Sequence, residues 1–260
     1  MDLRLDRPIR VFACDIDGCL AAVDHAALDL HRLQEIAELN RASVHDAAVP
    51  AVTLVTGRPH AYVDAFMQVL DVRLPATFEN GAGLATRHPY RAWLSPAVAE
   101  GRTAVADAER LLAERDDVFV QPGKLASLSV FAYDAAASVE RLTDDLERWV
   151  AHHRLPLDVD PSTGCVNLLL RGIDKATGFV ALCDVAAVAE DEVAGIGDAA
   201  GDGPWLARCA VSFAPAGATP ELRAAVTHAW GVPDVEAALA AYRALVAANR
   251  AWFARTAGGA

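Results

Sequence analysis

Two carboxylates one residue apart, Asp15 and Asp17, directly follow the apolar run 11–14. The run is short and is preceded by charged residues, which is typical of a buried strand in a parallel sheet. Gly18 then permits a tight turn. Because open α/β sheets bind ligands at the carboxyl ends of their strands, both carboxylates are expected at a binding edge. Such close negative charges repel each other unless a cation lies between them, and Mg²⁺ is the common choice beside phosphate. An ordinary acidic turn is the alternative, and these residues alone do not separate the two.

Later in the chain, further polar residues lie either directly after an apolar run or at the start of a predicted helix. A threonine is common in strands and an aspartate often caps a helix, so each residue also has a purely structural explanation. A lysine in the first turn of a helix opposes the helix dipole, which favours an anionic partner for it. These residues are Thr56, Gly57 and Arg58 after the run 51–55, Lys175 in the predicted helix 174–189, and Asp198 and Asp202 after the run 193–197.

In this order the carboxylate pair, the hydroxyl, the lysine and the second carboxylate pair resemble the four motifs of the haloacid dehalogenase-like phosphatases. The resemblance extends from about Val11 to about Arg223. The ordered set is far more specific than any single motif, because each motif lies where a strand ends or a helix begins. It implies an α/β fold with a Rossmann-like parallel-sheet core.

The alternation of strands and helices agrees with a core that an insertion interrupts. Up to residue 83 the order is strand, helix, strand, helix, strand, and the third strand is expected to run into 77–79 in the same parallel sheet. The segment 84–171 breaks this alternation and is predicted to be an α+β cap domain. The expected division is therefore a core of 1–83 and 172–260 and a cap of 84–171. An insertion between Asn80 and Lys175 resembles the C2 cap class, which includes Cof-type hydrolases and the sucrose-phosphate and trehalose-phosphate phosphatases.

The resemblance also implies roles in phosphate-ester hydrolysis. Asp15 would attack phosphorus and form an aspartyl-phosphate. Asp17 would protonate the leaving oxygen and then deprotonate the attacking water. Lys175 would neutralise charge on Asp15 and on the phosphate. Mg²⁺ is expected at a metal site formed by Asp15, the main-chain oxygen of Asp17, and Asp198, with Asp202 orienting Lys175 or a metal-bound water.

Substrate binding is expected from both parts of the chain. The Thr56 hydroxyl and the Gly57 amide would bind phosphate oxygens, with Arg58 and Asn80 close by. Caps of this kind close over the leaving group, so the segment 84–171 should determine specificity. Its polar candidates include Lys124 and Asn167. Because the enzymes that the chain resembles act mostly on phosphorylated sugars, a small sugar phosphate is the expected substrate.

Composition narrows the class of protein. The chain of 260 residues has 23 Lys and Arg against 35 Asp and Glu, a formal net charge of −12, which disfavours nucleic acid as a partner. No apolar run approaches the roughly 20 residues of a membrane helix, and the N-terminus lacks the apolar core of a secretion signal. The 5 cysteines show no CxxC spacing, which argues against a zinc site. We expect a cytoplasmic enzyme, monomeric or homodimeric, that acts on a small-molecule phosphate ester away from any membrane.

Two other functions fit parts of the pattern. A phosphotransferase or phosphomutase would use the same motifs, with a sugar hydroxyl replacing water as the acceptor. A phospho-receiver signalling module also combines acidic residues, a threonine and a lysine, but it needs a shorter chain and has no cap. Three departures from the resembled motifs are Ala199 and Gly201 in place of the fourth motif's serine and asparagine, Gly217 where an asparagine is frequent, and Cys19 where threonine is usual. None removes a predicted nucleophile, acid, lysine or metal carboxylate, so phosphate-ester hydrolysis remains the prediction.

Overall fold

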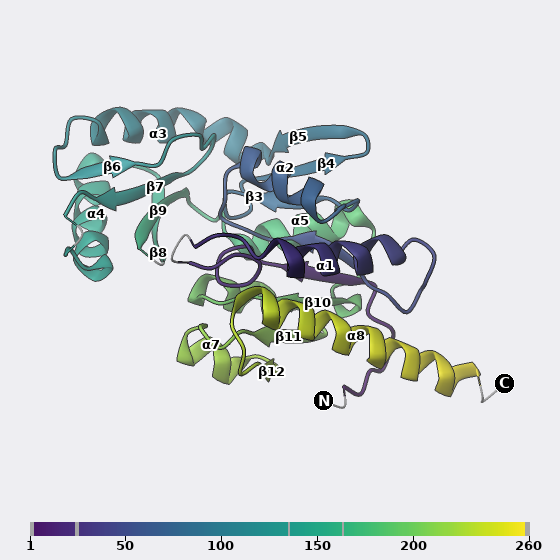
Figure 1. The fold of residues 1–260 in the computed structure, drawn as a ribbon. Helices are drawn as coiled ribbons and strands as arrows, with labels where there is room; N and C mark the ends of the chain where they lie inside the picture. Colours follow the sequence, from purple (N-terminus) through teal and green to yellow (C-terminus); the bar gives the residue numbers. More distant parts are fainter. Residues whose placement is uncertain (1–2, 24–25, 135, 163, 258–260) are drawn as a thin grey trace.

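A five-stranded parallel sheet forms the centre of the larger body in the computed structural model (Figure 1). The structure describes residues 3–23, 26–134, 136–162 and 164–257. The strand order is β12-β11-β10-β1-β2, so the first strand of the chain pairs directly with one far along it. The strands are β1 (Val11–Cys14), β2 (Ala51–Leu54), β10 (Val193–Ile196), β11 (Val211–Ala214) and β12 (His228–Ala229).

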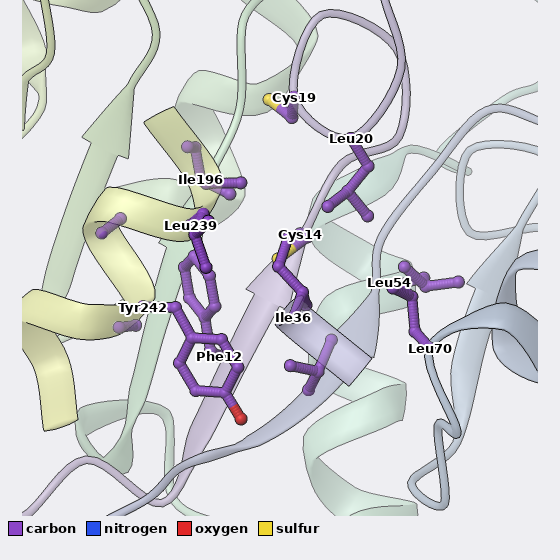
Figure 2. Packing of buried hydrophobic residues seen from close by; sticks show 14 of the residues in the cluster. Phe12, Cys14, Cys19, Leu20, Ile36, Leu54, Leu70, Ile196, Leu239 and Tyr242 are labelled. Atoms are coloured by element: carbon purple, nitrogen blue, oxygen red, sulfur yellow. The ribbon is translucent and has the colours of Figure 1, made fainter. Parts of the chain in front are cut away.

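Helices cover both faces of this sheet, because alternate residues of β1 point to opposite sides. On one side Phe12 packs with Ile36 of α1 and Tyr242 of α8, as Figure 2 shows. On the other side Val11 packs in a second cluster with Phe179 of α5. The helices of this body are α1 (Leu30–Ala42), α2 (His60–Val69), α5 (Lys175–Ala186), α6 (Gly203–Leu206), α7 (Pro220–Ala225) and α8 (Asp234–Ala257).

Helix α8 is fixed to the sheet by buried polar side chains as well as by apolar contact. The amide of Asn249 accepts from the main-chain N–H of Ile9 and donates to the Ile9 carbonyl, both at 2.8 Å. The Tyr242 hydroxyl donates to the Pro50 carbonyl at 2.6 Å. The buried polar groups of these two side chains thus have partners, as burial requires. Among the described helices, none is both long and apolar enough to cross a membrane.

The third strand differs from its prediction. β3 (Ala76–Phe78) is not part of the parallel sheet but pairs antiparallel with β4 (Gly83–Arg87), which pairs with β5 (Tyr90–Leu94). Glu79 and Asn80 have left-handed backbones, with φ of 51° and 55°, and turn the chain back into a hairpin. β3 is joined to the end of β2 by a side chain, because the Thr77 hydroxyl accepts from the Thr56 N–H at 3.3 Å. The prediction of a third parallel strand was therefore wrong.

The smaller body carries a four-stranded antiparallel sheet of order β6-β7-β9-β8, with two helices packed on one face. Figure 1 shows it beside the larger body, over the end of the parallel sheet. Its own apolar cluster joins alternate strand residues, such as Val130 and Leu168, to Leu146 of α4. Its elements are α3 (Pro96–Leu112), β6 (Val118–Val120), β7 (Leu128–Ala132), α4 (Val139–His153), β8 (Leu157–Ser162) and β9 (Cys165–Leu170).

The division of residues between the apolar clusters indicates where the cap begins. Leu84 and Ala85 of β4 belong to the apolar clusters of the larger body, whereas Val98 of α3 belongs to that of the smaller one. We therefore propose that the cap starts near Ser95, the N-cap of α3. This start is later than the expected boundary at 84.

Candidate active site

The carboxyl ends of three neighbouring parallel strands bring the predicted residues together. β10, β1 and β2 lie side by side and point the same way. Asp15 therefore follows β1 at the same edge where Thr56 follows β2 and Asp198 follows β10. The loop after Asp15 folds tightly, because the Ile16 carbonyl accepts from the N–H groups of Leu20 and Ala21, both at 2.8 Å.

Asp15, Lys175 and Asp202 form a buried chain of charges. The Lys175 ammonium donates to Oδ2 of Asp15 at 2.7 Å and to Oδ1 of Asp202 at 2.8 Å. Lys175 is the first residue of α5, and the preceding Asp174 caps that helix. The two carboxylates compensate for the unfavourable position of a cation at a helix N-terminus. The anionic partner expected for Lys175 is thus present twice.

The pKa values of this cluster reflect an excess of negative charge. Burial raises the pKa of Asp15 to about 7, with Lys175 opposing the rise and Asp202 adding to it. Burial also raises the pKa of Asp198 to about 8, and the Asp15 and Asp202 charges add to it. Burial lowers the pKa of Lys175, but the two carboxylates outweigh it and hold that pKa well above its ordinary value. Additional positive charge would therefore be stabilising here.

The donor set fits a divalent cation. Carboxylate oxygens of Asp15, Asp198 and Asp202 lie within 4.8 Å of one another, and oxygen donors suit Mg²⁺. Asp198 lines the cavity described below, whereas Asp202 is fully buried. Oδ1 of Asp202 accepts from Lys175 and Trp205, and Oδ2 accepts from the N–H groups of residues 198 and 199. Asp15 and Asp198 are therefore the better ligands, and Asp202 is suited to holding Lys175.

Glycine is required where Asp198 approaches the loop after β1. Gly18 has a φ of +69°, and a Cβ added to it would lie 2.3 Å from Oδ2 of Asp198. Any side chain there would push the Asp198 carboxylate away from Asp15. The turn predicted at Gly18 thus has a second physical basis, the close approach of a proposed metal ligand.

Asp17 is paired with Arg58. The Arg58 Nε lies 2.8 Å from Oδ2 of Asp17, and Nη2 donates to Oδ1 at 2.5 Å. The guanidinium also lies over the Tyr62 ring, 4.7 Å from its centroid. Arg58 therefore contacts the predicted acid–base residue, a contact that the sequence did not indicate.

Thr56 and Asn80 lie on either side of Gly57. Thr56 is fully buried and its Oγ1 accepts from the Arg58 N–H at 3.2 Å. A Cβ added to Gly57 would lie 2.7 Å from Oδ1 of Asn80, so glycine permits their contact. The buried Nδ2 of Asn80 makes no hydrogen bond within the part of the chain that the structure describes.

A cavity of about 360 Å³ lies between the parallel sheet's edge and the cap sheet. Of the predicted site residues, Thr56 and Asp202 are not among those that line it. Those that do are Asp15, Asp17, Gly57, Arg58, Asn80, Lys124, Asn167, Lys175 and Asp198.

A row of polar side chains crosses the cap face of this cavity. Ser129 of β7 is opposite Asn167 of β9, which is opposite Asp160 of β8. The Ser129 hydroxyl donates to Oδ1 of Asn167 at 2.7 Å, and Nδ2 of Asn167 donates to Asp160 at 3.3 Å. Gln121 extends the row, since its N–H donates to the Ser129 carbonyl at 2.8 Å. We name these four residues the polar row.

Asp160 and Gln121 were not predicted as site residues. The period-two alternation of the segment 157–160, apolar then acidic, already indicates that Asp158 and Asp160 share a face. Which face meets the cavity depends on how the cap lies over the core, and the alternation does not contain that information.

Comparisons with known proteins agree with this geometry. A model of haloacid dehalogenase-like hydrolases matches residues 121–240. A phosphoglycolate phosphatase of Methanopyrus kandleri is 26% identical over 212 residues, which cover 80% of this chain and 85% of that protein.

Two solved structures resemble the whole fold. A protein of Thermoplasma acidophilum has a TM-score of 0.72 at 19% identity, with 92% of this chain and 99% of that one covered. The sucrose-phosphatase of Synechocystis, solved with sucrose and phosphate, has a TM-score of 0.66 at 16% identity, with 92% and 98% covered. The expected fold class, a parallel-sheet core with a separate α+β sheet, is confirmed.

Proposed function

We propose that this chain, whose residues 121–240 match a model of haloacid dehalogenase-like hydrolases, is a Mg²⁺-dependent phosphatase of a small sugar phosphate. Catalysis would proceed through an aspartyl-phosphate on Asp15. The observation that carries the proposal is the contact of Lys175 with both Asp15 and Asp202, beside Asp198 at one sheet edge. In support of these roles, Asp15, Lys175 and Asp198 all line one cavity, where they would act as nucleophile, fixed cation and metal ligand.

The first step is attack of a carboxylate oxygen of Asp15 on phosphorus. The carboxylate and the phosphate are both anions, so neutralising their charge is the main way to lower the barrier. Lys175, held on its other side by Asp202, supplies one fixed positive charge. Asp15 and Asp198 would hold Mg²⁺, which when bound would neutralise charge on both the nucleophile and the phosphoryl oxygens.

Asp17 is the proposed acid and base. It lines the same cavity as Asp15, from which one residue separates it. It would give a proton to the leaving oxygen and later take one from the water that hydrolyses the aspartyl-phosphate. Arg58 holds both oxygens of its carboxylate and so orients it, and one of these oxygens would leave the guanidinium to carry the proton.

The substrate class rests on the size and polarity of the cavity. A volume of about 360 Å³ is at the small end for ligand pockets, which span roughly 300–1,000 Å³. The polar row offers amide, hydroxyl and carboxylate groups to the leaving group. Such groups suit a compact molecule with several hydroxyls, because each hydroxyl both donates and accepts.

The test is release of inorganic phosphate from a panel of phosphorylated sugars, sugar acids and hydroxy acids, with Mg²⁺ present. Phosphoglycolate belongs in the panel because the M. kandleri relative has that name. Asp15→Asn serves as the blank, and Asp116→Asn, on an exposed cap residue, as the matched control. The highest kcat/KM should fall on a sugar phosphate.

The outcomes separate the parts of the proposal. A hydroxy-acid phosphate as the best substrate would contradict the sugar class and leave the phosphatase standing. Transfer of labelled phosphate to an added sugar would identify a phosphotransferase. No release from any compound by the folded wild-type protein would contradict the phosphatase itself.

A further inference from the structure

Glu79 is a fully buried carboxylate at the junction of the core and the cap. It follows β3 and belongs to the larger body, in a left-handed conformation with a φ of 51°. Burying a carboxylate is costly unless its oxygens are hydrogen-bonded, so its partners matter. None of the catalytic steps proposed above uses it.

Among the described residues, every hydrogen-bond partner of its carboxylate belongs to one loop of the cap, between β6 and β7. Oε1 accepts from the N–H of Leu125 at 2.8 Å. Oε2 accepts from the N–H groups of Ala126 at 2.9 Å and Ser127 at 3.0 Å, and from the Ser127 hydroxyl at 3.1 Å. Three consecutive amides thus point at one carboxylate, an arrangement that holds the backbone strongly because hydrogen bonds to an ionised group are the stronger kind.

The residue immediately before these amides is Lys124, which lines the cavity. Burial lowers the pKa of Lys124, and the nearby Glu79 charge opposes that change. Within the described parts of the chain no hydrogen bond or ion pair of its ammonium is found. The other two cations that line the cavity are occupied, Arg58 by Asp17 and Lys175 by Asp15 and Asp202. Lys124 is therefore the cation left for an incoming anion.

We propose that Glu79 is a positioning residue that anchors the loop 125–127, so that Lys124 faces the cavity and neutralises the anionic charge of the substrate. The inference rests on the phosphatase function above and deepens it, because part of the phosphate-binding charge then comes from the cap. The core supplies nucleophile and metal ligands, while the cap supplies the free cation. Binding of an anion would in turn hold the cap against the core, through Lys124 on one side and Glu79 on the other.

The test is a double-mutant cycle with Glu79→Gln and Lys124→Met, measured on the best sugar phosphate of the panel. Glutamine keeps the size of Glu79 and removes its charge, and it turns a donor toward amides that are donors themselves. Each single variant should raise KM by roughly tenfold while kcat changes less. Because Glu79 acts through Lys124, the double variant should resemble Lys124→Met alone. Glu100→Gln, an exposed residue of α3, is the matched control for loss of one acidic charge.

Two results of this cycle would contradict the inference. If the fold-increase in KM of the double variant equals the product of the two single fold-increases, Glu79 acts independently of Lys124. An unchanged KM in Glu79→Gln would overturn the inference outright. If Glu79→Gln does not fold, Ser127→Ala replaces it, since that variant removes one hydrogen bond and leaves the carboxylate. Its KM should rise in the same direction by a smaller factor.

A second measurement does not depend on turnover. Amide hydrogen exchange of a peptide spanning 121–130 should become faster in Glu79→Gln, and inorganic phosphate, used as the probe, should bind more weakly to both single variants than to the control. If the panel shows no phosphatase activity but these two results hold, the proposed function is wrong and the anchoring remains. If wild-type turnover is high and exchange is unchanged, the anchoring alone is wrong.

Discussion

Arg58 holds both carboxylate oxygens of Asp17, with its Nε 3.1 Å from Oδ1 and 2.8 Å from Oδ2. The two residues come from the loops after β2 and β1, and Tyr62 of α2 lies under the guanidinium. A carboxylate gripped at two oxygens cannot rotate freely, so its direction relative to the neighbouring Asp15 is fixed. Both partners are partly shielded, with side chains exposed by 18% and 34%, which makes the pair stronger than a surface ion pair.

The first prediction concerns this pair. Arg58→Lys keeps the charge but replaces a planar fork of donors with a single ammonium. If Arg58 orients Asp17, kcat should fall by roughly 10–100-fold, a fraction of the usual contribution of an acid–base group, while KM changes less. Steady-state kinetics on a sugar phosphate measure both. Arg102→Lys, on an exposed residue of α3, should behave as the wild type. Equal kcat in Arg58→Lys and the control would exclude an orienting role.

The nucleophile gives the second prediction. Asp15→Asn preserves the size of the side chain and removes the attacking charge, so phosphate release should fall by at least about 10³-fold. Thermal melting should still show a cooperative transition, because the asparagine can accept from Lys175 through its oxygen. A variant that keeps a substantial share of wild-type turnover would assign the attack to another group.

The metal gives the third prediction. Chelation should abolish turnover and added Mg²⁺ should restore it. Asp198→Asn should raise the Mg²⁺ concentration for half-maximal rate more than Asp202→Asn does, since all the oxygens of Asp202 already accept hydrogen bonds inside the protein. Titration of rate against Mg²⁺ measures the two shifts. The reverse order would make Asp202 the direct ligand.

The fourth prediction concerns stability and pH without a divalent cation. Folded pKa values of about 7 for Asp15 and about 8 for Asp198 lie above the ordinary 3.8. Between about pH 4 and pH 8 the folded protein then binds more protons than the unfolded chain, so the free energy of unfolding falls as pH rises. Lys175, whose raised pKa matters only above its ordinary 10.5, does not contribute in this window.

Thermal melts in chelator should therefore show a Tm that decreases by roughly 5 °C across this window. Mg²⁺ should reverse the decrease, most strongly at the alkaline end where both carboxylates are ionised. Asp198→Asn should flatten the slope in chelator. A Tm in chelator that rises through the same window would contradict the raised pKa values.

The cap gives the fifth prediction. Asn167 stands in the middle of the polar row and bonds to Ser129 and Asp160 on either side. Asn167→Leu keeps the volume and removes both bonds, so kcat/KM for sugar phosphates should fall by roughly tenfold or more. Hydrolysis of a small aryl phosphate, which does not need the row, should fall much less. Equal losses on both substrates in a folded variant would mean that the row supports catalysis itself and does not only select the leaving group.

The sequence predicted the parts of this site that depend on strand topology. Asp15 and Asp198 each follow an apolar strand, and parallel strands place their carboxyl ends at one edge, so their meeting follows from local pattern. An anionic partner for Lys175 was indicated by its place in the first turn of a helix, and the family resemblance implied that Asp15 is this partner. The antiparallel course of β3 was not, because it depends on two left-handed residues that no periodicity marks.

Two contacts between side chains and remote segments, one across the two bodies and one within the larger body, were also beyond the sequence. Glu79 and its amide partners are remote in the chain, as are Arg58 and Asp17, which meet with the guanidinium over the Tyr62 ring. Such pairs depend on how separately folded segments dock, which the spacing of apolar residues does not encode. The sequence could name Lys124 as a candidate substrate-binding residue from its place beside Gly123. It could not show that, among the described cations that line the cavity, Lys124 is the one without an acidic partner.

The pairing of β1 with β10 also has a consequence for how the protein is made. β1 emerges from the ribosome early, yet Asp198 and the strand that carries it follow only after the entire cap has been synthesised. Until then one edge of β1 has no partner, and an open edge is the part of a sheet most prone to association with another chain. The cap strands β6 to β9, by contrast, pair only among themselves and can form as soon as they are synthesised. A nascent chain released before β10 would carry a folded cap beside an incomplete core that lacks Asp198, and its open sheet edge would be exposed to proteases.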